Sequence, residues 1–105
     1  MQGVECIQRA ADSEANYSYF PILVRPSYRS NRDQLLQRLK DRGVIARRYF
    51  HPLISEFGAY RDLPSAASKN LPVATEVARQ VLCLPIHPRL GAADVRRVID
   101  IVAGD

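Results

Sequence analysis

Residues 17–24 read YSYFPILV, and this stretch decides the fold class of the chain. Aromatic and large aliphatic residues dominate it, which is typical of a β-strand. Pro21 lies inside the stretch and cannot donate a hydrogen bond to a neighbouring strand, so we expect this strand to lie at a sheet edge or to be interrupted there. Because helical patterns follow it in the chain, the sequence predicts a domain that mixes strands and helices.

The first helical pattern covers residues 31–42. Ser30 and Asn31 are both preferred helix-capping residues, and Asp33 or Gln34 can bond back as the reciprocal partner. Gly43 is expected to end the helix, because glycine adopts the left-handed conformation without steric cost. The apolar stripe of this helix consists of Leu35, Leu36 and Leu39.

The rest of the chain adds two strands and two helices. We predict a second strand at 44–50, a helix that begins at Pro72, a short third strand at 82–86 and a last helix that begins near Gly91. Residues 53–71 are expected to form a long irregular loop. This order indicates an α+β fold: a small, mainly antiparallel sheet of about three strands, with helices packed on one face.

Size and composition fit one globular domain. The chain has 105 residues, a formal net charge of +4 and 47% hydrophobic residues. Residues 1–15 lack a periodic pattern, so we assign them to a lead-in segment and residues 16–105 to the domain. No apolar run is long enough to cross a bilayer, and the first residues lack the features of a signal peptide. We therefore expect a cytoplasmic protein with no membrane partner.

The sequence carries no complete catalytic apparatus that we can name. Glycine-rich phosphate loops, the HExxH zinc motif and the Gly-x-Ser-x-Gly nucleophile motif are all absent from it. Cys6, Cys83, His51 and His87 do not have the spacing of metal ligands. We therefore expect no catalytic residues and no metal site in this chain, and two reduced thiols, one of them in the core.

One cluster is chemically distinctive, at residues 46–53, ARRYFHPL. Arg48, Tyr49, Phe50 and His51 combine a guanidinium, a phenol, an aromatic face and an imidazole, which suit the phosphates and hydroxyls of an anionic sugar ligand. In a strand, alternation would send Arg48 and Phe50 to one face and Tyr49 and His51 to the other. We favour Tyr49 with His51 as the ligand-facing pair, because both can hydrogen-bond a sugar. On spacing alone, the alternative that these side chains merely cover the two faces of a sheet stays open.

Three stretches of the chain resemble the C-terminal part of the PLP-dependent nucleotide-sugar aminotransferases, the DegT/DnrJ/StrS family of fold type I. These stretches are NYSYFPILV at 16–24, RRYFHPLI at 47–54 and LCLPIHPRL at 82–90. A closing helix at 94–102 follows in the same order, so the resemblance covers about residues 16–103. The RRYFxPL string looks most like members that act on dTDP-linked 4-keto-6-deoxy sugars, and His51 stands where those members tend to carry an aromatic residue.

This resemblance implies that the chain serves an enzyme larger than itself. Family members transfer an amino group, commonly from glutamate, to a keto-sugar nucleotide through PLP in a homodimer. The family's cofactor lysine belongs to a larger N-terminal domain, and neither Lys40 nor Lys69 matches it. We therefore expect a small C-terminal domain that is inactive alone and holds no cofactor itself. Its expected partners are the PLP domain, a second subunit and the nucleotide-sugar substrate, with substrate contacts made by the cluster at 48–51.

Two other functions stay as alternatives to this interpretation. The first is a stand-alone α+β module for binding or oligomerisation. The second is RNA binding on an aromatic sheet face, which ranks lower because the sequence lacks the Lys/Arg-Gly-Phe/Tyr signature and the further aromatic strands of an RNA-recognition fold. Nucleic acid is therefore not expected as a partner.

Overall fold

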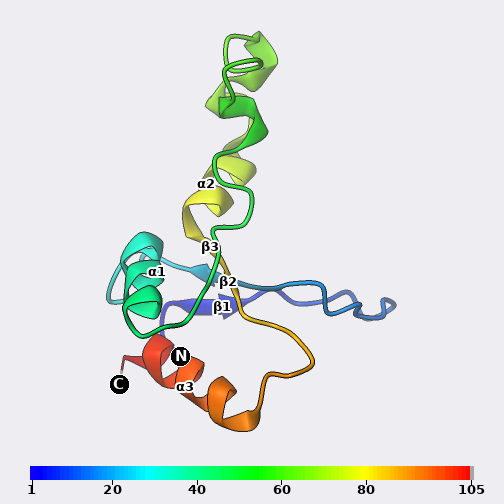
Figure 1. Cartoon of the computed structure of the whole chain (residues 1–105). Helices are drawn as coiled ribbons and strands as arrows, with labels where there is room; N and C mark the ends of the chain where they lie inside the picture. The colour runs from blue at the N-terminus through cyan, green and yellow to red at the C-terminus, as the bar shows by residue number, and fades with distance from the viewer. Residues whose placement is uncertain (105) are drawn as a thin grey trace.

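The computed structural model describes residues 1–104 and has a three-stranded antiparallel sheet with three α-helices (Figure 1). The strands lie side by side in the order β1-β2-β3. Their bounds are Val4–Cys6 for β1, Phe20–Val24 for β2 and Val81–Leu84 for β3. The helices are α1 at Arg32–Asp41, α2 at Pro72–Gln80 and α3 at Ala92–Ala103. The predicted α+β class is confirmed.

The core lies between the sheet and helices α1 and α3. Ile22 and Val24 of β2 and Leu82 of β3 are buried in one cluster with side chains from both helices. The helix side chains of this cluster are Leu35, Leu39, Val98, Ile101 and Val102. Because side chains alternate along a strand, these strand residues share one face, and the two helices cover that face.

The helix ends follow the local signals that the sequence carries. The Asn31 side chain accepts from the Gln34 backbone N–H at 2.9 Å, and the Gln34 side chain accepts from the Asn31 N–H at 3.0 Å, so the predicted reciprocal cap is present. Gly43 follows α1 with φ +75°, and Gly104 follows α3 with φ +105°. Pro72 opens α2, where its missing N–H costs nothing.

The prediction for residues 1–15 is wrong at Val4–Cys6, which form the edge strand β1. This strand pairs antiparallel with β2, with Val4 opposite Val24 and Cys6 opposite Ile22. Gly3 makes the pairing possible: its φ is +76°, and a Cβ there would lie 2.2 Å from the backbone N of Tyr28. A three-residue strand with a single half-buried side chain, Val4, gives no sequence period, so only the pairing reveals it.

The position of β2 differs from the expectation drawn from Pro21. Ile22 and Leu23 have β1 on one side and β3 on the other, so β2 is the central strand. Pro21 pairs with Cys83 on the β3 side, but β1 ends opposite Ile22. The proline therefore lies where the strand is paired on one side only, which is the position at which a missing donor is tolerated.

The predicted second strand at 44–50 is also wrong. This segment forms only an isolated bridge, in which Arg47 N–H donates to Cys83 O at 3.0 Å and Cys83 N–H donates to Arg47 O at 2.8 Å. Phe50 adopts φ +48°, outside the β region, so the chain turns there instead of continuing along β3. Val44 and Ala46 are buried in the core, and this local burial produced the strand-like pattern.

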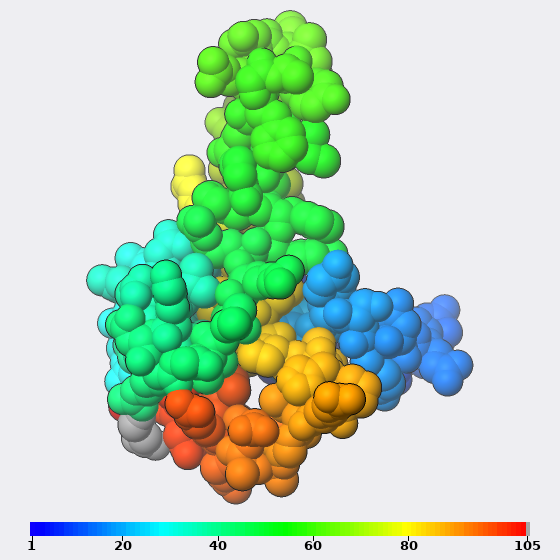
Figure 2. Space-filling model, viewed as in Figure 1, coloured from blue at the N-terminus to red at the C-terminus, as the bar shows by residue number. Residues whose placement is uncertain are grey.

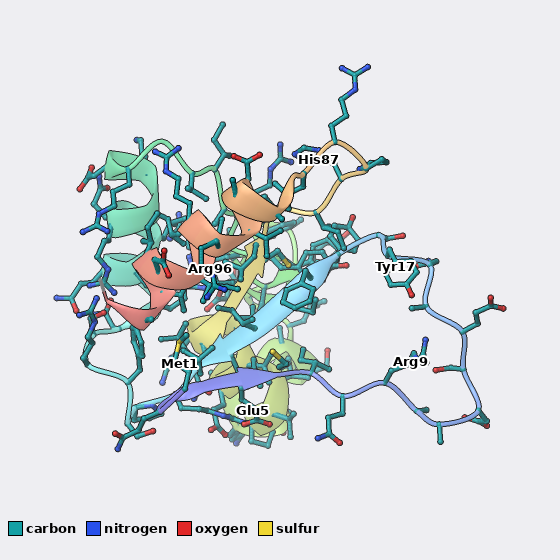
Figure 3. The ribbon with its side chains drawn as sticks, turned by 90° about the horizontal axis from the view of Figure 1, so that it is seen from below. Met1, Glu5, Arg9, Tyr17, His87 and Arg96 are labelled. Carbon is teal, nitrogen blue, oxygen red and sulfur yellow. The ribbon has the colours of Figure 1, made fainter. Side chains whose placement is uncertain are left out.

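Two segments extend from the body of the molecule. Residues 53–71, here called the arm, project away from the sheet, and α2 returns the chain to β3 (Figures 1 and 2). The arm contains three single-turn 3₁₀-helices: η1 at Ile54–Glu56, η2 at Pro64–Ala66 and η3 at Ser68–Asn70. Residues 7–19 form a loop that extends from the ends of β1 and β2, and Arg9 and Tyr17 lie on it away from the sheet (Figure 3). No helix within residues 1–104 is long and apolar enough to span a bilayer.

Candidate functional site

The candidate site lies where the segment after α1 meets the end of the sheet. The bridge between Arg47 and Cys83 fixes this segment beside β3. Tyr19, immediately before β2, reaches the same place, because Phe20 pairs with Leu84 at that end of β3. Residues far apart in the sequence, near positions 19, 48 and 84, therefore meet at one edge.

Three aromatic rings lie next to one another at this edge. The ring centroids of Tyr49 and Phe50 are 3.9 Å apart with an interplanar angle of 29°. Those of Tyr19 and Tyr49 are 4.6 Å apart with an angle of 47°. Tyr49 therefore contacts both of the other rings, and it is half-buried, whereas Tyr19 and Phe50 are 56% and 70% exposed.

This stacking corrects the predicted alternation of the cluster. Tyr49 and Phe50 were expected on opposite faces, but their rings lie against each other. The physical reason is the left-handed conformation of Phe50, which brings neighbouring side chains to one side, whereas an extended strand separates them. The argument that pairs Tyr49 with His51 through alternation therefore does not apply.

The Tyr49 phenol is held in its protonated form. Partial desolvation raises the pKa of Tyr49, and the adjacent Tyr19 side chain raises it further. The hydroxyl thus stays neutral at physiological pH and can donate a hydrogen bond. Burial likewise raises the pKa of the neighbouring Cys83 thiol, so this cysteine is an inert core residue here, as the sequence predicted for one of the two.

Arg48 is oriented by an acidic side chain on α1. Its Nη1 lies 3.7 Å from Asp33 Oδ1, and the same oxygen accepts from Arg32 Nε at 2.8 Å. Arg32 is itself only 3% exposed, and its Nη1 donates to the carbonyl oxygens of Ala78 and Val81, both at 3.0 Å. An exposed ion pair of this kind contributes little stability, but it restricts where the Arg48 guanidinium can lie.

The rings and guanidinium groups surround an open cavity of about 400 Å³. Arg48, Tyr49 and Phe50 all line it, so the structure brings three of the four predicted site residues together. His51 is exposed and is not among the lining residues. The remaining lining residues are Ser18, Tyr19, Ile45, Arg47, Cys83, Leu84, Pro85 and Ile86.

Tyr19 and Arg47 are two of the eight lining residues that the predicted site did not include. Tyr19 is separated from Tyr49 by 30 positions, and its side chain was assigned only to a strand. Tyr19 can be assigned to the site only if the pairing of β2 with β3 is known. This pairing places the start of β2 beside the end of β3, and the bridge at Cys83 places the Arg47 segment beside the same strand.

The residues that line the aromatic cavity do not fit a PLP site. Such a site needs a lysine that forms a Schiff base and an acidic partner for the pyridine nitrogen. Both lysines are exposed, Lys40 on α1 and Lys69 in η3 of the arm, and neither lines the aromatic cavity. Within residues 1–104, no three metal-ligating side chains gather to form a metal site either.

Comparison with curated proteins gives enzymes of sugar-nucleotide metabolism. The chain is 40% identical over 102 residues to a dTDP-4-amino-4,6-dideoxy-D-glucose transaminase of Escherichia coli, which covers 97% of this chain and 28% of that protein. It is 36% identical to the enzyme of the same name from Shigella dysenteriae, over 95% of this chain and 27% of that protein. The chain thus spans little more than a quarter of the length of these relatives.

Solved structures agree on the fold. A DegT/DnrJ/EryC1/StrS aminotransferase from Brucella abortus matches with a TM-score of 0.78 at 24% identity, over 97% of this chain and 26% of that one. An aminotransferase from Streptoalloteichus hindustanus matches with a TM-score of 0.66 at 33% identity, over 95% of this chain and 25% of that one. The family model of these aminotransferases covers residues 1–103, including β1. This chain belongs to the DegT/DnrJ/EryC1/StrS aminotransferase family.

Proposed function

We propose that this chain is the small C-terminal domain of a PLP-dependent aminotransferase that acts on a keto-sugar nucleotide, of the dTDP-4-keto-6-deoxy-sugar type. The observation that carries the proposal is the cavity in which Arg48, Tyr49 and Phe50 converge. Family membership and the names of the two enterobacterial relatives support the substrate class. The domain in this proposal comprises residues 16–105 together with β1, which completes the sheet.

The domain contributes substrate contacts, and the amino transfer takes place on PLP held elsewhere in the enzyme. Arg48 can bind a phosphate through its guanidinium, and the neutral Tyr49 hydroxyl can donate to a sugar oxygen. Phe50 offers an apolar ring, and the exposed His51 can reach a ligand that extends beyond the cavity. None of these groups carries out a covalent step, so the chain alone is inactive.

The proposed partners of the domain are the PLP-binding part of the enzyme and a second subunit. The arm supports this, because it projects from the body with exposed apolar side chains. These side chains are Ile54, Phe57, Tyr60 and Leu63. Such a grouping on one protruding segment is typical of a surface that another protein surface covers.

Substitutions at the cavity should lower turnover of the sugar nucleotide in the full-length aminotransferase. Arg48→Met removes a charge-assisted contact and should reduce kcat/KM for the sugar substrate roughly 10- to 100-fold. Tyr49→Phe removes one neutral hydrogen bond and should reduce it about 3- to 10-fold, and we expect a similar effect from His51→Ala. Steady-state kinetics with the keto-sugar nucleotide as the varied substrate measures these changes.

Two controls separate a substrate contact from general damage. PLP absorbance should be unchanged in each variant, because the cofactor is bound by other residues. Arg89→Met changes an exposed arginine outside the cavity and should leave kcat/KM as it is. If the Arg48, Tyr49 and His51 variants all fold and keep the wild-type kcat/KM, the cluster is structural and the proposed substrate role is wrong.

Amide hydrogen exchange should show whether the rest of the enzyme covers the arm. In the isolated chain, amides of residues 53–71 should exchange quickly, because the hydrogen bonds recorded within the arm are confined to local turns. Amides of α1 and α3 around Leu35 and Ile101 should exchange slowly, since they belong to the core. Exchange in the arm should slow when the chain is part of the full-length enzyme, while α1 changes little. Equal exchange of the arm in both proteins would contradict the proposed interface.

A further inference from the structure

A cavity of about 760 Å³ lies between α2 and the turn that joins β2 to α1. We call it the α2 cavity, and both helices that flank it are labelled in Figure 1. It shares no lining residue with the aromatic cavity. The proposed substrate contacts therefore leave the α2 cavity without a role.

The charges that line the α2 cavity are unbalanced. Four basic side chains and one acidic side chain line it: Arg25, Arg32, Lys69, Arg79 and Glu76. The one carboxylate is already engaged, because Glu76 Oε1 lies 3.9 Å from Arg25 Nη1 and accepts from Gln80 Nε2 at 3.3 Å. The cavity therefore has an excess of positive charge.

Two of the basic side chains are available to a ligand. Lys69 and Arg79 are exposed, and neither side chain has an ion-pair or hydrogen-bond partner among residues 1–104. Lys69 precedes α2 and Arg79 lies near its end, and the helix from Pro72 to Arg79 rises by about 10 Å. A ligand with several charged groups matches this separation better than one small anion does.

A further positive charge lies behind the wall of the cavity. Arg38 Nη2 donates to the Tyr28 hydroxyl at 2.9 Å and to Ser30 Oγ at 3.3 Å, and both acceptors belong to lining residues. Among residues 1–104, no carboxylate pairs with Arg38, and its buried Nε has no hydrogen-bond partner. A partly buried charge is screened less than an exposed one, so Arg38 adds to the positive potential. Because Ser30 Oγ accepts from Arg38, its own proton is available to a ligand.

We propose that the α2 cavity binds a small multivalent anion of the oligophosphate class, with Lys69 and Arg79 pairing with its charged oxygens and Ser30 donating a hydrogen bond. The site is separate from the proposed substrate contacts. Tyr28 is the one aromatic side chain among the lining residues, and it is only 7% exposed. The cavity therefore offers a nucleobase no ring to stack on, and the ligand needs none.

Titration of the ¹⁵N-labelled 105-residue chain with tripolyphosphate tests this site. We expect saturable shifts of the amide signals of Ser30, Thr75 and Arg79. These shifts should persist in an Arg48→Met variant, because Arg48 belongs to the other cavity. Inorganic sulfate, which has a single anionic group, should bind more weakly. Absence of saturable shifts at these amides, or equal affinity for sulfate and tripolyphosphate, would overturn the proposal.

Matched substitutions separate the site from the net charge of the chain. Arg79→Met should weaken tripolyphosphate binding about fivefold, as expected for the loss of one exposed ion pair, and Lys69→Met should act similarly. Arg96→Met removes the same charge from an exposed position on α3, outside the α2 cavity, and should leave the dissociation constant unchanged. If Arg79→Met and Arg96→Met weaken binding equally, the anion follows the net charge and the proposed site is wrong.

Removal of the one carboxylate should have the opposite effect. Glu76→Gln abolishes a negative charge that repels the anion, so affinity for tripolyphosphate should rise about two- to fivefold. Glu14→Gln makes the same change in the loop at 7–19, outside the α2 cavity, and should not alter affinity. Unchanged affinity in the Glu76 variant would show that the anion does not enter the cavity.

A hexaglutamate peptide distinguishes a small anion from an acidic protein segment. Its carboxylates lie on mobile side chains, whose ordering costs free energy, so it should bind more weakly than tripolyphosphate. Tighter binding of hexaglutamate that depends on Arg79 would assign the cavity to an acidic segment and overturn the oligophosphate proposal. The kinetics of Arg48→Met in the full-length enzyme test the substrate contacts separately, so either proposal can fail alone.

Discussion

Replacement of Arg32 by methionine should destabilise the domain by about 2–5 kcal/mol, because it leaves two buried carbonyl groups without a donor. Arg32 Nη1 donates to the carbonyl oxygens of Ala78, near the end of α2, and of Val81, the first residue of β3. Methionine can fill much of the space of the arginine stem but cannot donate a hydrogen bond. Each orphaned carbonyl then pays its desolvation cost in full.

Loss of the Arg32 side chain should also affect the candidate site. Without Arg32, Asp33 loses its 2.8 Å hydrogen bond from Nε and no longer has a fixed position from which to orient Arg48. In the full-length aminotransferase, kcat/KM for the keto-sugar nucleotide should therefore fall in a folded Arg32 variant, although Arg32 does not line the aromatic cavity.

Urea unfolding followed by circular dichroism measures the change in the free energy of unfolding. Arg96→Met provides the matched control, because Arg96 is an exposed residue on α3 (Figure 3). The control should lie within about 0.5 kcal/mol of the wild type. An Arg32→Met variant as stable as this control would show that the hydrogen bonds from Arg32 do not hold the α2–β3 junction.

Replacement of Gly3 by alanine should remove β1 from the sheet and cost about 2–5 kcal/mol. Two effects add: the backbone at φ +76° is unfavourable for alanine, and the new Cβ would lie 2.2 Å from Tyr28 N and 2.3 Å from Tyr28 Cα. Backbone atoms cannot move aside as a flexible side chain can. The Arg25 N–H, which donates to Gly3 O at 2.8 Å, would lose its partner as well.

Gly58→Ala is the matched control, because a Cβ at Gly58 has no atom within 4 Å and lies on the arm. It should change the free energy of unfolding by no more than about 0.5 kcal/mol. In the Gly3 variant, the β1–β2 hydrogen-bonded amides should also lose their protection from exchange. If β1 stays protected and stability is unchanged, the close approach of Gly3 to Tyr28 is not needed for the fold.

The structure and the family argue against the two alternative functions, RNA binding and a stand-alone module. The described residues form three strands, whereas the RNA-recognition fold presents bases on a four-stranded sheet. The face that carries Ile22, Val24 and Leu82 is covered by α1 and α3, and the exposed aromatic rings gather at one end of the sheet. Family membership also makes a stand-alone module the weaker interpretation.

The sequence alone determined the features that depend on neighbouring residues. The Asn31–Gln34 cap, the glycine after α1 and the proline that opens α2 act within one helical turn, so their signals are complete in the printed sequence. The cluster at 48–51 was found for a similar reason, because its unusual chemistry is concentrated in four consecutive residues.

Only the tertiary structure decided which segments pair and where the site lies. β1 exists because Gly3 packs against Tyr28 and Val4 meets Val24, contacts that join residues more than 15 positions apart. The segment at 44–50 is no strand, because Phe50 turns the chain after a single bridge to Cys83. Tyr19 lies at the candidate site because β2 pairs with β3. Such contacts depend on the free energy of the whole fold, so the pattern of neighbouring residues in the sequence does not predict them.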